Sequence, residues 1–155
     1  LLQNMIGIWS DGHMDRIAPE LTIDRQQGGR ALMVAGHESR LGQVITNLVE
    51  NARSFVHPGT GRIDIRLSGN AKWVEIRVED NGPGIRAENV ETIFKRFYTD
   101  RPGADDFGQN SGLGLSISRQ IVEAHGGTLT AENITRPNDT ETVLGARFIV
   151  RLPRE

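Results

Sequence analysis

Apolar and polar residues alternate along much of the chain, and this alternation predicts strands. Period-two patterning over residues 63–68 and 74–79 indicates two half-buried strands. The Ser68-Gly69-Asn70 turn between them predicts an antiparallel hairpin. Further strands are expected at residues 21–23 and 31–34, in the segment that begins at Leu129, and at the end of the chain over residues 148–152.

Apolar residues recur at three-to-four spacing over residues 38–56, which predicts the longest helix of the chain. Its apolar stripe consists of Leu41, Ile45, Leu48, Ala52 and Phe55. Shorter helices are expected over residues 1–10, 86–98 and 112–125, the last ended by Gly126-Gly127. These elements predict an α+β fold: a two-layer α/β sandwich with a mixed, mostly antiparallel sheet covered on one face by about three helices.

Length and composition limit the classes of protein that remain. The 155 residues correspond to one domain, and 18 basic against 20 acidic residues, with few aromatics, argue against a nucleic-acid partner. Without cysteine there is neither a disulfide nor a thiolate zinc site. No apolar run approaches the roughly 20 residues of a membrane span, so no direct membrane contact is expected. The apolar start of the chain, without a helix-start signal, suggests that further sequence precedes it.

The strand over residues 74–79 ends in an acidic, glycine-rich turn. The alternation places Asp80 on the apolar side, where a carboxylate is costly unless hydrogen-bonded. Gly82 and Gly84 then allow backbone to approach a flat ligand closely. An adenine fits both features, with its amine donating to Asp80. The alternative is that Asp80 only caps the turn.

Two asparagines lie one turn apart on the long helix. Asn47 and Asn51 flank its apolar stripe, although asparagine disfavours helix interiors. An amide oxygen is a suitable ligand for Mg²⁺ that also binds substrate phosphates. The alternative is that both are solvated surface amides.

Residues 99–111 contain almost no apolar side chains. A loop of this kind is uncommon in a compact domain and is often a mobile lid. It ends at Gly112-Leu113-Gly114-Leu115, which opens a helix. Free N–H groups at such a helix start suit a phosphate chain.

Four motifs in this order resemble those of the catalytic ATP-binding domain of bacterial sensor histidine kinases, in the wider family of gyrase, Hsp90 and MutL. Residues 47–55 resemble the N box, 80–84 the G1 box, 94–97 the F box with its Phe-x-x-Phe, and 112–115 the G2 box. The resemblance covers nearly the whole chain, which would be one catalytic domain over residues 1–155 with an ATP lid at about 99–111.

The resemblance implies a set of binding residues for two cofactors, ATP and Mg²⁺. Asp80 would bind the adenine amine and Asn51 would hold the metal against the phosphates. The expected ATP-binding residues are Asn47, Asn51, Asp80, Gly82, Gly84, Ile85, Tyr98, Arg101, Ser111, Gly112, Leu113, Gly114 and Leu115. None of them is expected to be catalytic in the sense of attacking or accepting the phosphate.

One departure from the family pattern concerns the phosphates. Histidine kinases commonly carry a cation three residues after the second asparagine, and Ser54 occupies that position here. Arg53 is a poor substitute, because it points about 200° round the helix from Asn51. Arg101 in the lid is the candidate for the missing charge. The segment 145–148 only loosely resembles the family's closing motif and receives no binding role.

Asn47 separates the branches of the superfamily. Hydrolytic members resemble one another in a glutamate at this position, which activates water. An amide cannot act as a general base, and Glu50 lies elsewhere on the helix. Transfer of the phosphate is therefore favoured over rapid hydrolysis.

The resemblance implies a protein-histidine kinase of a two-component system, on the cytoplasmic side of an inner-membrane sensor. The γ-phosphate would pass to a histidine on a separate dimerisation domain, absent from these residues, and a response regulator would follow. None of His13, His37, His57 or His125 stands in an acceptor-like motif. The alternatives are an ATPase-type clamp, a degenerate docking module and a serine-directed kinase of related fold.

Overall fold

The strands of the computed structural model assemble into one five-stranded sheet, described here over residues 20–25, 33–57, 59–95 and 114–155. The strand order is β1-β2-β3-β5-β4. All neighbours pair antiparallel except β1, which lies parallel to β2 at one edge. The strands are β1 (Glu20–Arg25), β2 (Arg62–Gly69), β3 (Trp73–Asp80), β4 (Thr128–Arg136) and β5 (Asp139–Pro153).

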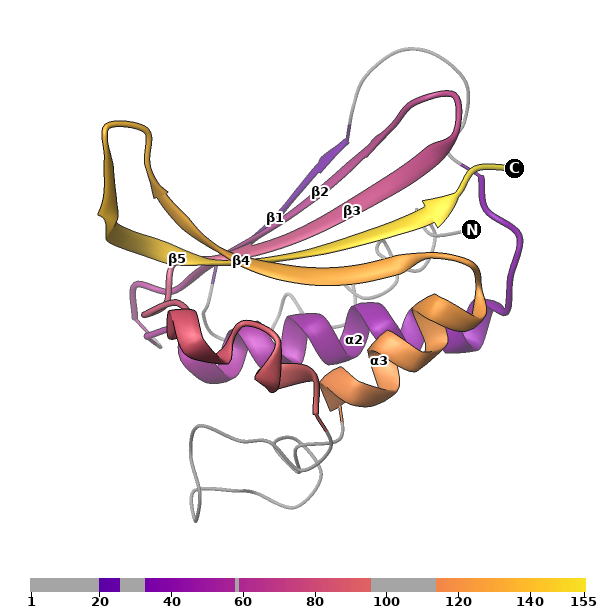
Figure 1. Ribbon diagram of the computed structural model, residues 1–155. Coiled ribbons are helices and arrows are strands. Elements are labelled where there is room, and N and C mark those ends of the chain that lie inside the picture. Colours follow the sequence, from indigo (N-terminus) through magenta and orange to yellow (C-terminus); the bar gives the residue numbers. More distant parts are fainter. Residues whose placement is uncertain (1–19, 26–32, 58, 96–113) are drawn as a thin grey trace.

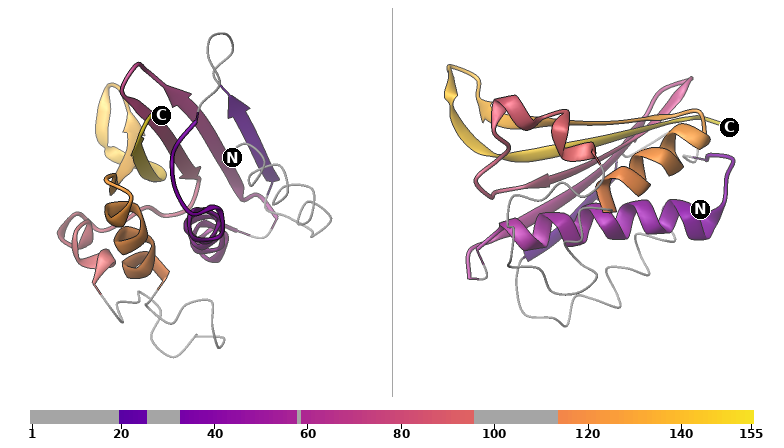
Figure 2. Two further views of the ribbon diagram at one scale, coloured as in Figure 1. Left: turned by 90° about the vertical axis from the view of Figure 1, so that its right-hand side faces the viewer. Right: turned by 60° about the horizontal axis from the view of Figure 1, so that its bottom comes forward.

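Two α-helices, α2 (Glu38–Phe55) and α3 (Gly114–Ala124), lie side by side under one face of the sheet (Figures 1 and 2). The 3-10 turns η1 (Ala87–Asn89) and η2 (Thr92–Phe94) lie on the same side, next to α3. The predicted two-layer α+β sandwich with helices on one face is therefore confirmed. No helix of the described segments is both long and apolar enough to cross a membrane.

The core forms where the apolar stripe of α2 meets the inner face of the sheet. Of the predicted stripe, Leu48 and Ala52 are completely buried, as is the neighbouring Val49, whereas Phe55 is half-buried. The inner face contributes alternate residues of β2, β3 and the second half of β5, as period-two patterning requires. Among the described residues, the largest fully buried side chains include Leu41, Leu48, Ile63, Ile65, Ile76, Leu129, Leu152, Val44, Val49, Val74 and Val78.

Helix α3 ends as its sequence predicts. Gly126 has a φ of +78°, a left-handed conformation that suits glycine. Its N–H donates to the Glu123 carbonyl, and the Gly127 N–H donates to the Val122 carbonyl. These two bonds form a Schellman motif, which satisfies carbonyls at the end of the helix.

Three predicted elements differ from the structure. The helix expected over residues 86–98 is wrong over its described part, which forms η1 and η2; its β-branched residues and Asn89 favour tight turns over an α-helix. Met33 and Val34, expected in a strand, lie in irregular backbone. The last strand begins at Asp139 rather than near residue 148. Its first half pairs with β4 but is mostly polar and shows no apolar alternation, so the sequence pattern did not reveal it. The helix expected over residues 1–10 lies outside the described residues.

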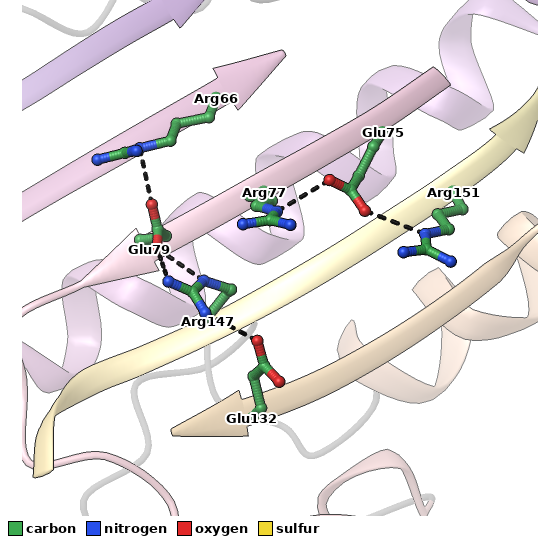
Figure 3. Close-up of polar contacts among 7 residues, drawn as sticks. All are labelled: Arg66, Glu75, Arg77, Glu79, Glu132, Arg147 and Arg151. Atoms are coloured by element: carbon green, nitrogen blue, oxygen red, sulfur yellow. Dashed lines mark hydrogen bonds and ion pairs between the residues drawn. The ribbon is translucent and has the colours of Figure 1, made fainter. Parts of the chain in front are cut away.

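The face of the sheet away from the helices carries a ladder of ion pairs (Figure 3). Glu79, with only 9% of its side chain exposed, lies between Arg66 and Arg147 at 2.9 and 2.6 Å. Arg147 also binds Glu132 at 2.8 Å. A second group joins Arg77 and Arg151 through Glu75. These pairs connect β2, β3, β5 and β4 across the sheet.

Replacement of Glu79 tests whether this ladder stabilises the sheet. Glu79→Gln should lower the free energy of unfolding by about 1–3 kcal/mol, because Arg147 loses a shielded charged acceptor. Glu132→Gln, at the other end of Arg147 and 51% exposed, should change it by less than about 1 kcal/mol. Urea unfolding of both variants measures the difference, and equal effects would contradict the assigned role of Glu79.

Candidate functional site

The site begins at the carboxyl end of β3, where the alternation of buried residues includes Asp80. Asp80 is 7% exposed and faces the helix side of the sheet, as its position in the sequence predicts. Its Oδ1 accepts hydrogen bonds from the backbone N–H groups of Gly82 at 2.9 Å and Ala146 at 3.4 Å. Among the described residues, Oδ2 has no donor. The protein thus binds Oδ1 of the carboxylate, whereas Oδ2 can still accept hydrogen bonds from a ligand.

The glycine turn after β3 is held in a conformation that few other residues could adopt. Gly84 has a φ of +82°, and a Cβ there would collide with the Val143 side chain. A Cβ at Gly82 would lie 3.1 Å from the Phe55 carbonyl oxygen. The turn therefore rests against the C-terminal end of α2, which brings Asp80 next to the helix that carries Asn51.

Two residues that support this turn were missed by the sequence analysis. A Cβ at Gly145 would overlap the Asp80 carbonyl oxygen, so glycine there lets β5 approach the end of β3. Asn133 on β4 binds both backbone groups of Ile85, accepting from N–H at 2.7 Å and donating to C=O at 2.6 Å. A glycine inside a strand is a signal of close backbone approach that could have identified Gly145. Nothing in the local sequence identifies Asn133.

On α2, Asn47 and Asn51 are both half-buried. Asn47 Nδ2 donates to the Gly114 carbonyl at 3.3 Å and to the hydroxyl of the fully buried Ser118 at 3.1 Å. Asn47 therefore ties α2 to the first turn of α3. The Asn51 side chain has no hydrogen-bond partner among the described residues, and its amide oxygen is available to a ligand.

Helix α2 carries no cation three residues after Asn51, where the family pattern places a phosphate-binding one, because Ser54 occupies that position. Ser54 Oγ donates to the Asn51 carbonyl at 2.7 Å. Arg53 Nη1 binds Glu50 Oε1 at 3.2 Å, consistent with the expectation that Arg53 is a poor substitute.

The start of α3 supplies the fourth part of the site. Gly114 and Leu115 begin this helix, and a Cβ at Gly114 would lie 3.8 Å from Cγ and 3.9 Å from Cβ of Asn47. Backbone N–H groups at such a position suit an anion. The other expected residues of this region, Tyr98, Arg101, Ser111, Gly112 and Leu113, lie outside the described residues.

The two elements that flank residues 96–113 are joined by Arg119. Its guanidinium lies 4.3 Å from the centre of the Phe94 ring and 3.0 Å from Glu91. Phe94 is buried and packs edge-on against Phe148, with ring centres 6.2 Å apart. The Phe94 end of the Phe-x-x-Phe motif is therefore a structural anchor between η2, α3 and the sheet; Phe97 lies outside the described residues.

The donor set decides which metals the site suits. No cluster of three or more His, Cys, Asp or Glu side chains that could hold a metal exists in the described parts of the chain. An amide oxygen beside a phosphate-binding helix start suits Mg²⁺ shared with a nucleotide, since that ion uses few protein ligands and takes the rest from phosphates and water.

These features lie on a two-layer α/β sandwich, and comparison with known proteins identifies its family. The chain belongs to the family described as histidine kinase-, DNA gyrase B-, and HSP90-like ATPase, whose model matches residues 36–155. Within this family its relatives are sensor kinases. The chain is 58% identical over 135 residues to the sensor protein ChvG of Rhizobium meliloti and 54% identical over 138 residues to that of Agrobacterium fabrum.

The matches cover 86% and 88% of this chain but 23% of each relative, so the chain spans about a quarter of their length. Among solved structures, the catalytic domain of the histidine kinase ThkA superposes with a TM-score of 0.79 at 28% identity, covering 99% of this chain and 92% of that one. The mycobacterial sensor histidine kinase MprB gives a TM-score of 0.74 at 27% identity, covering 99% and 93%. The predicted resemblance to histidine kinase catalytic domains is confirmed.

The buried position of Asp80 predicts a dependence of stability on pH. Burial raises the pKa of Asp80 above its ordinary 3.8, although the Gly82 and Ala146 amides oppose this. The native state then binds this proton more tightly than the unfolded chain. The contribution to stability is complete below the unfolded pKa and is lost as the pH rises through the native pKa.

Asp80→Asn, which keeps an oxygen for the two amides and carries no charge, should therefore be at least as stable as the wild type at neutral pH. Its advantage should shrink as the pH falls through the native pKa of Asp80. Urea unfolding of both proteins at a series of pH values tests this. A variant less stable at neutral pH by more than about 1 kcal/mol would show that the amides require the charged acceptor.

Proposed function

We propose that this domain binds Mg–ATP and donates the γ-phosphate to a histidine on a separate dimerisation domain of a two-component sensor kinase. The observation that carries the proposal is the Asp80 carboxylate, buried and held through Oδ1 by two backbone amides. Its Oδ2 has no described donor, and the exocyclic amine of adenine supplies the missing one. Ile85 and the glycines of the turn would lie against the base.

The phosphates and the metal would occupy the region between α2 and α3. Asn51 would be the protein ligand of Mg²⁺, and Gly114 and Leu115 would face the phosphate chain at the helix start. Asn47 would position that helix start through its bonds to Gly114 and Ser118. Tyr98, Arg101, Ser111, Gly112 and Leu113 complete the proposed set, with Arg101 as the cation that Ser54 does not provide.

Transfer rather than hydrolysis follows from the chemistry of Asn47. A side chain that donates to two described acceptors and has no basic atom cannot activate a water molecule. Catalysis would therefore consist of positioning and of charge neutralisation by Mg²⁺ and backbone donors. The ATPase-type clamp remains the second candidate, because the matching family includes gyrase- and HSP90-like ATPases.

The partners follow from the same proposal. The acceptor would be a dimerisation and phosphotransfer domain outside these 155 residues, with the catalytic domain on the cytoplasmic side of a membrane sensor. His125 is not offered as an acceptor, because its Nε2 accepts from the backbone N–H of His37 at 3.1 Å and its Nδ1 lies 2.7 Å from the Ile121 carbonyl oxygen. A response regulator is the expected recipient of the phosphate; ThkA has been solved in complex with the response regulator TrrA.

Binding of a non-hydrolysable ATP analogue to the 155-residue domain tests the adenine contact. Asp80→Asn should weaken the affinity measured by calorimetry by roughly tenfold to a hundredfold, the cost of a lost charged hydrogen bond of about 1.5–3 kcal/mol. Asp64→Asn, on the outer face of β2, serves as the matched control and should bind as the wild type does. A wild-type domain that binds no nucleotide would instead favour the docking module.

The proposed metal ligand has its own test. Asn51→Ala should reduce the gain in affinity that Mg²⁺ gives to the analogue by at least about tenfold, since even outer-shell partners of metals have effects of this size. Gln43→Ala, on the exposed face of the same helix, is the control. Magnesium titrations at fixed analogue concentration measure both, and an unchanged magnesium dependence in Asn51→Ala would place the metal elsewhere.

Mixing the domain with a dimerisation domain from a matching sensor kinase separates the two candidate functions. Radiolabelled phosphate on the acceptor histidine, with little free phosphate, supports the kinase. Steady release of ADP by the domain alone supports the clamp.

A further inference from the structure

We infer that Asn133, at the sheet edge, is a positioning residue for the base-binding end of the site, holding the glycine turn in the geometry that adenine requires. This inference rests on the proposed function, because it assigns a role within the same site. Asn133 lies 48 residues from Ile85 in the sequence, and its half-buried side chain reaches the turn from strand β4.

The Asn133 side chain makes two hydrogen bonds to the backbone of Ile85. The Asn133 amide uses its oxygen for the Ile85 N–H at 2.7 Å and its nitrogen for the Ile85 carbonyl at 2.6 Å. One side chain therefore satisfies both backbone groups of a residue outside any strand, which would otherwise need water. The two bonds fix the orientation of the Ile85 peptide groups as a neighbouring strand would.

The turn is closed on its other side as well. Gly84, directly before Ile85, has a positive φ and no room for a Cβ beside Val143 and the Asn133 oxygen. The Gly82 N–H, at the start of the turn, donates to Asp80 Oδ1 at 2.9 Å. Movement of Ile85 away from Asn133 would therefore also strain the bond that orients the Asp80 carboxylate.

The sheet register connects Asn133 to Asp80 by a second route. Asn133 is the cross-strand partner of Ala146 on β5, and the Ala146 N–H donates to Asp80 Oδ1 at 3.4 Å. A single cross-strand pair thus supports both halves of the base site, the carboxylate through Ala146 and the turn through Asn133.

Asn70 offers a matched control for a purely structural asparagine. Its Oδ1 accepts from the backbone N–H groups of Lys72 and Trp73 at 2.8 and 2.9 Å, so it also makes two bonds to the main chain. It lies in the β2–β3 turn, at the opposite end of β3 from Asp80. Loss of each asparagine removes the same number of hydrogen bonds.

The experiment compares Asn133→Ala with Asn70→Ala in three measurements: thermal unfolding without nucleotide, calorimetric affinity for the non-hydrolysable ATP analogue with Mg²⁺, and amide hydrogen exchange at Ile85. Both variants should lose comparable thermal stability. Only Asn133→Ala should weaken the affinity for the analogue, by roughly fivefold to thirtyfold. This is the effect expected from the loss of one to two hydrogen bonds, each with the net strength typical of proteins. Only Asn133→Ala should accelerate exchange at Ile85.

Asn133→Asp is the second variant, for the case in which the alanine variant does not fold. The aspartate keeps an acceptor for the Ile85 N–H but turns an oxygen toward the Ile85 carbonyl. The affinity for the analogue should therefore fall, although the side chain keeps its shape. Equal affinities of folded Asn133→Ala and Asn70→Ala for the analogue would overturn the inference and leave the proposed function intact. Failure of both Asn133 variants to fold would also overturn it, because Asn133 would then have a structural role. A wild-type domain that does not bind the analogue would overturn both.

Discussion

The candidate site depends on one buried carboxylate and on the backbone amides that make its burial tolerable. Asp80 ends a strand whose other inward residues are apolar, and two N–H groups bind its Oδ1. One amide comes from the turn that follows and the other from β5, which reaches Asp80 only because residue 145 is a glycine. The requirement to hydrogen-bond this carboxylate therefore determines both the turn and the approach of the neighbouring strand.

Helix α2 links this base end to the phosphate end. Its C-terminal carbonyl at Phe55 rests against the glycine turn, and its Asn47 binds the first turn of α3. Asn51 lies between these two contacts with no described partner for its side chain. A single rigid helix thus sets the spacing between the group that would recognise a base and the groups that would hold phosphates and metal.

Local sequence patterns were sufficient for much of this arrangement. Alternation predicted β2, β3 and the inward position of Asp80, and the apolar stripe predicted α2, because both depend on residues close in the chain. The helix expected over residues 86–98 failed over its described part because short apolar spacing does not separate an α-helix from successive 3-10 turns. Asn133 and Gly145 were missed because their partners, Ile85 and Asp80, lie 48 and 65 residues away and are brought near only by the sheet.

The outer face of the sheet bears on the site through strand register. A slip of β5 by one residue would exchange its two faces, turning Ala146 outward and Arg147 toward the core. The bonds of Arg147 to Glu79 on β3 and to Glu132 on β4 oppose such a slip, since a buried arginine without these partners is costly. Glu79 and Glu132 immediately precede Asp80 and Asn133 in the sequence. The ion pairs on the solvent side therefore hold in register the residues that form the base site on the opposite side.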